Sequence, residues 1–311
     1  MTTDAHHGHP STTPCGPSGP GGATRPIGPA GRDPLPLAGR TVLVTGVSRR
    51  VGIGHAIACR AAAQGASIVA HHYSPHDAAQ AWGADDIDAV MASIATHLTD
   101  GARLTPVGAD LAVSGQPARV VDAAVEAAAD AGHPLAALVC NQAMSEPDAA
   151  LLDITEDVLD RHWAVDARAS ILLAQAFARA VIGEEPGGEA DGPASDPTRA
   201  IVFLTSGQAQ GPLPGEIAYG AAKAAIAGIA LTIADELADH GIRVNTVNPG
   251  PVDTGYLTAE AFESIRGMFP FGRFGEPDDA ARLITWLLSD DARWITGQVI
   301  NSEGGFARWC S

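Results

Sequence analysis

The chain has 311 residues, 46% hydrophobic and 18% charged, which is enough apolar material for a sizeable core. Its formal net charge of −17 argues against a nucleic-acid partner, because a phosphate backbone repels an acidic surface. The four cysteines form no C-x-x-C pair and no zinc pattern is complete, so we expect no metal. No apolar run approaches a membrane span and the N-terminus lacks a signal-peptide core, so we expect a cytoplasmic protein with no membrane partner.

The predicted elements follow from composition and hydrophobic pattern. Residues 1–36, rich in Pro, Gly, Ser, Thr and His, predict a disordered tail, and the acidic Pro/Gly-rich segment 183–198 predicts a flexible insertion. Strands are predicted at residues 41–45, 67–72, 104–111 (ending at Asp110), 135–140, 200–205, 242–247 and 295–300. Helices are predicted at residues 54–64, 75–98 with a break at Gly83, 118–131, 159–182, 219–240, 257–269 and 277–289.

This alternation of strands and helices predicts an α/β fold. We expect a doubly wound, Rossmann-like, mostly seven-stranded parallel sheet with helices on both faces, in a single domain over residues 37–311. Such sheets bind ligands at the carboxyl ends of their strands.

A glycine-rich turn, TGVSRRVGIG over residues 45–54, joins the first strand to the first helix. Glycines let the backbone approach a pyrophosphate at a helix N-terminus, so this turn predicts a dinucleotide site. The second strand ends at His72, a candidate cofactor contact, without the carboxylate that would bind the ribose of NAD, while Arg49 and Arg50 lie in the turn. We therefore expect NADP, with NAD as the alternative; plain surface charge is the competing explanation of the two arginines.

Three further candidate cofactor residues lie at or just after the ends of predicted strands. Asp110 and Leu111 end the third strand and would border the adenine, and Asn141 follows the fourth strand and would lie along the cofactor ribose.

Ser206, Tyr219 and Lys223 stand at fixed offsets of 13 and 4 positions. The Tyr and Lys side chains lie one helical turn apart, on one face. An ammonium there favours the phenolate and lowers the pKa of the tyrosine, and a serine hydroxyl can hydrogen-bond the substrate oxygen. A Tyr-x-x-x-Lys pair alone is usually a solvated helix face, but with a dinucleotide site it predicts proton transfer to or from a carbonyl or alcohol oxygen while a hydride moves.

In this order the motifs resemble the short-chain dehydrogenase/reductase family in its single-domain form, over about residues 37–306. The matching pieces are the glycine-rich turn, Asp110-Leu111, Asn141-Gln142-Ala143, Ser206, Tyr219-x-x-x-Lys223 and residues 248–254 (NPGPVDT). The resemblance implies that Tyr219 is the general acid/base, that Lys223 also holds the nicotinamide ribose, and that Ser206 orients the substrate oxygen. It also implies phosphate contacts at Gly46, Ser48, Gly52 and Gly54, and a cofactor contact at Ile53. The nicotinamide contacts that it implies are Pro249, Gly250, Val252 and Thr254. A homodimer or homotetramer built by the helices at 159–182 and after Tyr219 is implied as well.

Three positions depart from the family pattern. Gly46 and Gly52 are 6 positions apart, where the common pattern has 4, so a two-residue insertion carries Arg49 and Arg50. Gln142 replaces the second Asn of an Asn-Asn-Ala-Gly element. Asp166 stands where the family usually has an Asn that holds a water next to the lysine, so we include Asp166 among the catalytic candidates and expect altered activity there.

The substrate is expected to be a small carbonyl compound or alcohol. Enoyl reductases of related fold space their Tyr and Lys more widely, so the gap here favours C=O chemistry, with a 3-oxoacyl thioester or another apolar ketone as the substrate class. Its expected borders are Gln142, Met144, Gln208, residues 213–217 and a lid over residues 256–271 with many apolar side chains. The alternative is a dinucleotide-binding sensor or scaffold with little turnover, against which the intact Ser206, Tyr219 and Lys223 argue.

Overall fold

The computed structural model describes residues 33–182, 199–255, 262–263 and 266–306. Almost all of the predicted tail, the whole of the predicted insertion 183–198 and part of the lid candidate lie outside the described residues. From Pro34 onward the chain forms one compact unit.

Seven parallel strands form one sheet in the order β3-β2-β1-β4-β5-β6-β7, which confirms the predicted doubly wound fold. The strands are β1 (Thr41–Val44), β2 (Ser67–His72), β3 (Leu104–Gly108), β4 (Leu135–Cys140), β5 (Arg199–Leu204), β6 (Ile242–Asn248) and β7 (Val299–Asn301). The central strands are almost entirely buried, as their continuous apolar sequences require in a sheet covered on both faces.

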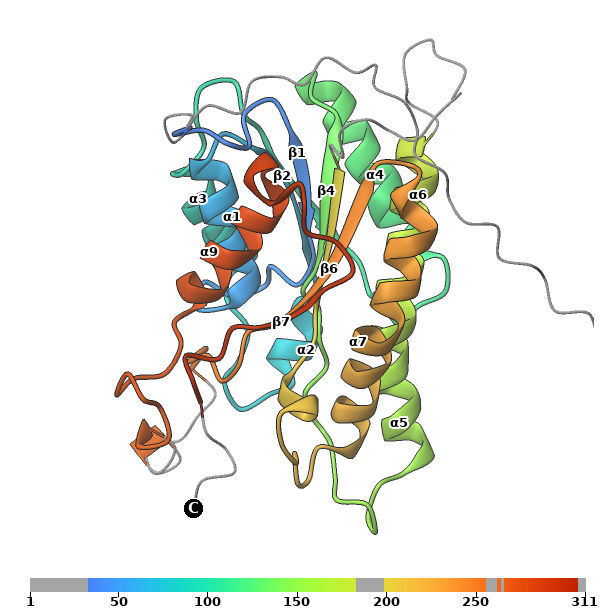
Figure 1. Ribbon diagram of the computed structural model, residues 1–311. Helices are drawn as coiled ribbons and strands as arrows, with labels where there is room; N and C mark the ends of the chain where they lie inside the picture. The colour runs from blue at the N-terminus through green and yellow to red at the C-terminus, as the bar shows by residue number, and fades with distance from the viewer. Residues whose placement is uncertain (1–32, 183–198, 256–261, 264–265, 307–311) are drawn as a thin grey trace, which may run out of the picture. The chain divides into compact units, whose positions relative to one another are not determined.

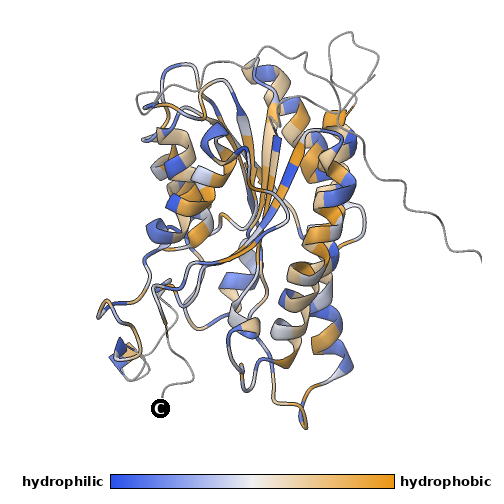
Figure 2. Cartoon of the chain, in the orientation of Figure 1, coloured by the Kyte–Doolittle hydropathy of each residue, from blue (hydrophilic) through white to orange (hydrophobic). Residues whose placement is uncertain are grey.

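Helices cover both faces of the sheet (Figure 1). One face carries α1 (Ile53–Ala63), α3 (Ile87–Ala95) and α9 (Pro277–Leu288), and the other carries α4 (Gln116–Ala131), α6 (Ala169–Ile182) and α7 (Ile217–Ala238). Each layer has its own hydrophobic core against the strands. Figure 2 shows hydrophobic residues concentrated along the strands and the helices beside them. The remaining elements are short: α2 (Ser74–Ala78), α5 (Glu156–His162), a π-helical turn (Trp163–Arg168) and 3₁₀ turns at Gly207–Ala209 and Asp290–Ala292.

Two predicted strands are too long. β3 ends at Gly108 rather than Asp110, because the Asp110 side chain accepts a hydrogen bond from the N–H of Ala112 and turns the chain away from the sheet. β7 begins at Val299 rather than residue 295. In the preceding segment the side chain of Asn245 hydrogen-bonds Ile295 and Gln298, and these side-chain bonds interrupt the backbone pairing with β6, although the N–H of Gly297 still donates to the carbonyl of Val244.

The predicted helices differ mainly at interruptions. The break at Gly83 is confirmed: α2 ends at Ala78, Gly83 has φ +72°, and α3 starts after Asp86, whose carboxylate caps it. The helix predicted at 159–182 begins earlier, at Glu156, and contains the π-helical turn, which hydrophobic spacing alone did not indicate.

The helix α7 has 22 residues and, by length and composition alone, is apolar enough to cross a membrane, contrary to the expectation from sequence. It packs along the sheet instead, with Lys223 and Ile226 among its buried residues. Helices of a sheet-covering layer pass the same test of length and composition, so this feature gives weak support for a membrane role.

Candidate active site

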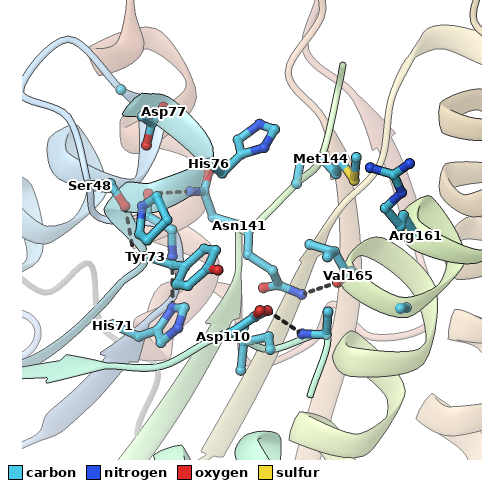
Figure 3. A pocket seen from close by; sticks show the side chains of 18 of the residues that line it. Ser48, His71, Tyr73, His76, Asp77, Asp110, Asn141, Met144, Arg161 and Val165 are labelled. Atoms are coloured by element: carbon cyan, nitrogen blue, oxygen red, sulfur yellow. Dashed lines mark hydrogen bonds between the residues drawn. The ribbon is translucent and has the colours of Figure 1, made fainter. Parts of the chain in front are cut away.

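A cavity of about 700 Å³ opens at the carboxyl ends of β1, β2 and β4. This is where the strand order reverses, the place at which doubly wound sheets bind their ligands. Figure 3 shows Ser48, His71 and Tyr73 on one side of it and Met144 and Val165 on the other. Nine of the predicted cofactor residues line it: Gly46, Ser48, Arg49, Gly52, Ile53, Asp110, Leu111, Asn141 and Thr254.

The glycine-rich turn is packed so tightly that two of its glycines have no substitute. A Cβ on Gly54 would lie 2.4 Å from the carbonyl oxygen of Gly46, and one on Gly46 would lie 2.8 Å from Nδ2 of Asn141. That Nδ2 donates to the carbonyls of Thr45 and Gly46, so Asn141 fixes the turn from the neighbouring strand. Gly54 therefore acts by close packing and does not belong to the described cavity lining.

The amino end of α1 fits a phosphate group. It carries no acidic residue in its first turn, and its N-cap, Gly52, offers no side-chain cap. Gly52 and Ile53 line the cavity, so the helix N-terminus, with its partial positive charge, faces the space in which a dinucleotide would lie.

The two arginines of the lengthened turn diverge. Arg49 lines the cavity: its Nη2 donates to the carbonyl of Thr254 at 3.0 Å, its Nε lies 3.9 Å from Oδ1 of Asp77, and its guanidinium lies over Trp82. Arg50 is outside the described lining, with a half-exposed side chain whose Nε is 3.4 Å from Oδ2 of Asp85. The structure thus brings only Arg49 to the cavity.

At the end of β2 the structure places His71, and not His72, among the described lining residues. His71 Nδ1 accepts a hydrogen bond from the N–H of Gly46 at 3.3 Å, and its Nε2 bonds the carbonyl of Ala109 at 3.0 Å. Burial lowers the pKa of His71 to about 4, so the ring is neutral at ordinary pH. The next residue, Tyr73, donates its N–H to the hydroxyl of Ser48 at 3.0 Å.

Several other lining residues were missed from the sequence. They are His76 and Asp77 on α2, and Asp160, Arg161, Ala164, Val165 and Arg168 on α5 and the π-helical turn. The residues on α2 follow a strand end directly, which was an available signal; those on the other segment reach the cavity only through the packing of the helices.

Tyr219 and Lys223 lie one turn apart on α7, with Lys223 Nζ 5.5 Å from the centre of the Tyr219 ring. Lys223 is buried, and its Nζ donates to the carbonyl of Leu204 at 3.2 Å. The hydroxyl of Thr205 donates to the carbonyl of Lys223 at 2.8 Å, so the end of β5, where Ser206 follows, is tied to the same turn of α7. The side chains of Ser206, Tyr219 and Lys223 are outside the described lining of the cavity.

A residue that sequence reasoning missed holds the amino end of α7. The carboxylate of Asp148, on the loop after β4, accepts from the N–H groups of Ala218 at 3.0 Å and Tyr219 at 2.8 Å. These are first-turn N–H groups that a helix cannot satisfy itself. No local motif marks Asp148, because the partners are 70 and 71 positions away.

Asp166 lies in the π-helical turn and is 1% exposed. Its Oδ1 accepts the N–H of Met144 at 2.7 Å, which ties the turn to the segment after Asn141. Gln142, the other departure from the family pattern, donates from Nε2 to the carbonyl of Val165 at 3.2 Å and to the hydroxyl of Ser170 at 2.8 Å. The longer side chain of Gln142 thus spans to the π-helical turn and satisfies one of its carbonyls.

The segment after β6 is held by glycine geometry. Gly250 has φ +67°, and a Cβ there would lie 2.7 Å from Cα of Glu303. Val252 forms a bridge with Gly275. Pro249, Gly250 and Val252 are outside the described cavity lining, whereas Thr254 belongs to it.

Of the expected substrate borders, Gln142 and Met144 line the cavity. Gln208 donates to the hydroxyl of Thr205 at 3.0 Å, beside Ser206. In the described part of the lid candidate, Phe262 and Phe269 pack on Phe274, so these lid side chains belong to a small aromatic cluster. Within the described residues, no group of three or more metal-ligating side chains is present.

Comparison with known proteins decides the family. The model described as "Enoyl-(Acyl carrier protein) reductase" matches residues 46–307. The chain belongs to the short-chain dehydrogenase/reductase family.

Relatives in this short-chain dehydrogenase/reductase family cover most of the chain. It is 38% identical to the uncharacterized oxidoreductase YjdA of Bacillus subtilis, covering 86% of this chain and 97% of the relative. It is 34% identical to an NADPH-dependent aldehyde reductase-like chloroplastic protein of Arabidopsis thaliana, covering 88% and 96% respectively. Among solved structures, the angucycline C-6 ketoreductase LanV with bound NADP superposes with a TM-score of 0.71 at 32% identity, covering 86% of this chain and 96% of that one.

Proposed function

We propose that this protein is an NADP-dependent reductase of ketones or aldehydes with an apolar body. The observation that carries the proposal is what the carboxyl ends of the strands bring together: a dinucleotide-sized cavity lined by Arg49, and at the end of β5 buried Lys223, bonded to the carbonyl of Leu204 and placed beneath the ring of Tyr219. Membership of an oxidoreductase family supports the same chemistry.

The nicotinamide, when bound, supplies the hydride for the carbonyl carbon. The chain's task is the proton for the carbonyl oxygen, and we assign it to the Tyr219 hydroxyl. Lys223 places a buried positive charge near the Tyr219 ring, which stabilises the phenolate left after the proton has moved. Ser206, held next to this pair through Thr205, is assigned to donate a hydrogen bond to the substrate oxygen.

The cofactor preference rests on Arg49, the one arginine of the glycine-rich turn that reaches the cavity. A guanidinium recognises a 2′-phosphate through charge-assisted hydrogen bonds. The names of two relatives, one NADPH-dependent and one with bound NADP, support this choice. One observation favours NAD instead: Asp77 lines the same cavity near Arg49, and a carboxylate can bind the free ribose hydroxyls of NAD.

Carbonyl rather than enoyl reduction is the reading that the residues favour. The description of the matching family model names an enoyl reductase. The Tyr219-to-Lys223 spacing of one helical turn resembles that of the family's carbonyl reductases, and two of the relatives are named aldehyde reductase and ketoreductase. One wall of the cavity is lined by the apolar residues Ala143, Met144 and Val165, and it offers an apolar surface to the body of a substrate. A 3-oxoacyl thioester, a homo-oligomeric state and a cytoplasmic location stay predictions.

The deciding experiment is a parallel fluorescence titration with NADPH and NADH, followed by turnover assays on polycyclic aromatic ketones, 3-oxoacyl thioesters and 2-enoyl thioesters. Tight NADPH binding with turnover of a ketone supports the proposal. Turnover of the enoyl thioester alone would overturn the reaction class, and tight binding without turnover on any of these compounds would favour the sensor or scaffold alternative.

A further inference from the structure

A histidine lies fully buried behind the catalytic tyrosine. His162 is the last residue of α5 and is 0% exposed. The edge of its ring meets the ring of Tyr219, with centroids 6.4 Å apart and planes at 78°. Its Nδ1 lies 3.8 Å from Oδ2 of Asp166, one helical turn further along the chain.

Both nitrogens of the His162 ring face oxygen acceptors. Nε2 lies 3.0 Å from the carbonyl oxygen of Pro147, which can only accept a hydrogen bond, so this nitrogen carries a proton. Nδ1 faces the Asp166 carboxylate at an ion-pair distance of 3.8 Å, and both Nδ1 and Oδ2 are buried without a hydrogen-bond partner among the described residues. A neutral imidazole carries one N–H only, so two acceptors favour the imidazolium.

The electrostatics agree with this protonation state. Burial works to lower the pKa of His162, but the neighbouring Asp166, the Pro147 carbonyl and Asp148 outweigh it, and the pKa is raised. The titratable groups that face the ring come from three segments: Asp166 on the π-helical turn, Asp148 on the loop after β4, and Tyr219 on α7.

The charge of this pair matters to the reaction. The proposed chemistry requires Tyr219 to become a phenolate, and an uncompensated carboxylate buried nearby would oppose that ionisation. The usual family residue at the position of Asp166 is a neutral asparagine, so the carboxylate here introduces a charge that the site must cancel. An imidazolium beside it makes the pair neutral.

We propose that His162 is a positioning residue whose positive charge cancels that of Asp166 and thereby lets Tyr219 ionise beside Lys223. This inference rests on the proposed function, because it assigns to Tyr219 the role of proton donor and acceptor. It also explains how the chain keeps a working site with Asp166.

The test is the pH profile of NADP-linked alcohol oxidation, whose alkaline rise reports the phenolate. The variants are His162→Gln, the double variant His162→Gln/Asp166→Asn, and His97→Gln on the exposed surface as the control for the same chemical change. We expect His162→Gln to move the midpoint upward by about one pH unit, with roughly tenfold slower oxidation below the midpoint. The double variant has neither charge and should return the midpoint to the wild-type value, while His97→Gln should leave the profile unchanged.

Loss of rate at every pH with an unmoved midpoint would overturn the inference, because it indicates a purely structural role. A double variant whose midpoint stays displaced would also overturn it. If His162→Gln fails to fold, judged by lost NADPH binding, the double variant is measured against the wild type alone. A midpoint at the wild-type value then supports the inference, and a displaced midpoint overturns it. The proposed function fails separately, if Tyr219→Phe retains turnover.

Discussion

The carboxylate of Asp148 accepts the backbone N–H of Tyr219 at 2.8 Å, so the loop after β4 holds the amino end of the helix that carries Tyr219, the proposed proton donor. The same carboxylate accepts the N–H of Ala218 at 3.0 Å. Because a helix leaves its first N–H groups unsatisfied, this tertiary contact does for α7 what a local cap does for other helices.

Removing the Asp148 carboxylate should therefore reduce both stability and turnover. We expect Asp148→Ala to lower the free energy of unfolding by about 1–2 kcal/mol and to reduce kcat, because the first turn of α7 loses its cap. Asp148→Asn should cost less, since its amide oxygen still accepts a hydrogen bond. Chemical denaturation and steady-state kinetics measure the two effects. Equal behaviour of alanine and wild type in both would show that the contact does not position Tyr219.

Tyr219→Phe removes the hydroxyl and leaves the ring that packs against His162 and Lys223. We expect kcat for ketone reduction to fall by about 10²–10⁴-fold, the usual contribution of general acid catalysis, while the Kd for NADPH changes less than about threefold. Stopped assays with excess enzyme and a fluorescence titration give the two numbers. Unchanged turnover would assign the proton to another group.

The divergence of the two arginines predicts unequal effects on cofactor affinity. Arg49→Ala should raise the Kd for NADPH about tenfold or more and change that for NADH little, because only Arg49 reaches the cavity. Arg50→Ala, which loses an exposed contact to Asp85, should raise the NADPH Kd far less. Similar losses for both variants would contradict this assignment.

Asp77→Asn tests whether the negative charge of Asp77, which lies near Arg49 in the same cavity, opposes the binding of a 2′-phosphate. If Asp77 weakens phosphate binding near Arg49, the amide should improve NADPH affinity by a few-fold. Weaker NADH binding in the same variant would show that Asp77 binds ribose hydroxyls, and would make NAD the native cofactor.

Because His71 is buried and neutral, we expect the protein to lose stability on mild acidification. Its pKa is lowered by burial from 6.5 to about 4, so between these values the unfolded chain binds a proton that the folded chain does not. The contribution of His71 to the free energy of unfolding is therefore fully present above pH 6.5. It is lost as the pH falls toward 4, and the loss is at most about 3 kcal/mol. Denaturation midpoints across this range measure it, and His71→Gln should flatten the dependence. An identical slope in that variant would place the sensitivity elsewhere.

The positions of the strands along the chain and the doubly wound fold could be predicted from the sequence, because alternating strands and helices are marked by local pattern. Apolar runs between turn residues marked every strand, and the glycine-rich turn lay between a strand and a helix. The predictions went wrong at the ends of β3 and β7, where side chains of Asp110 and Asn245 compete with the strand ladder.

By itself, the sequence determined the fold, the motif order and the offsets of Ser206, Tyr219 and Lys223, since these follow from residue type and spacing. Only the tertiary structure decided that Arg49 reaches the cavity and Arg50 does not, that His71 rather than His72 lines it, and that Asp148 and His162 lie beside Tyr219. The physical reason is that these contacts join elements distant in the chain. Their energies depend on burial and charge in a shared environment, which no local pattern records.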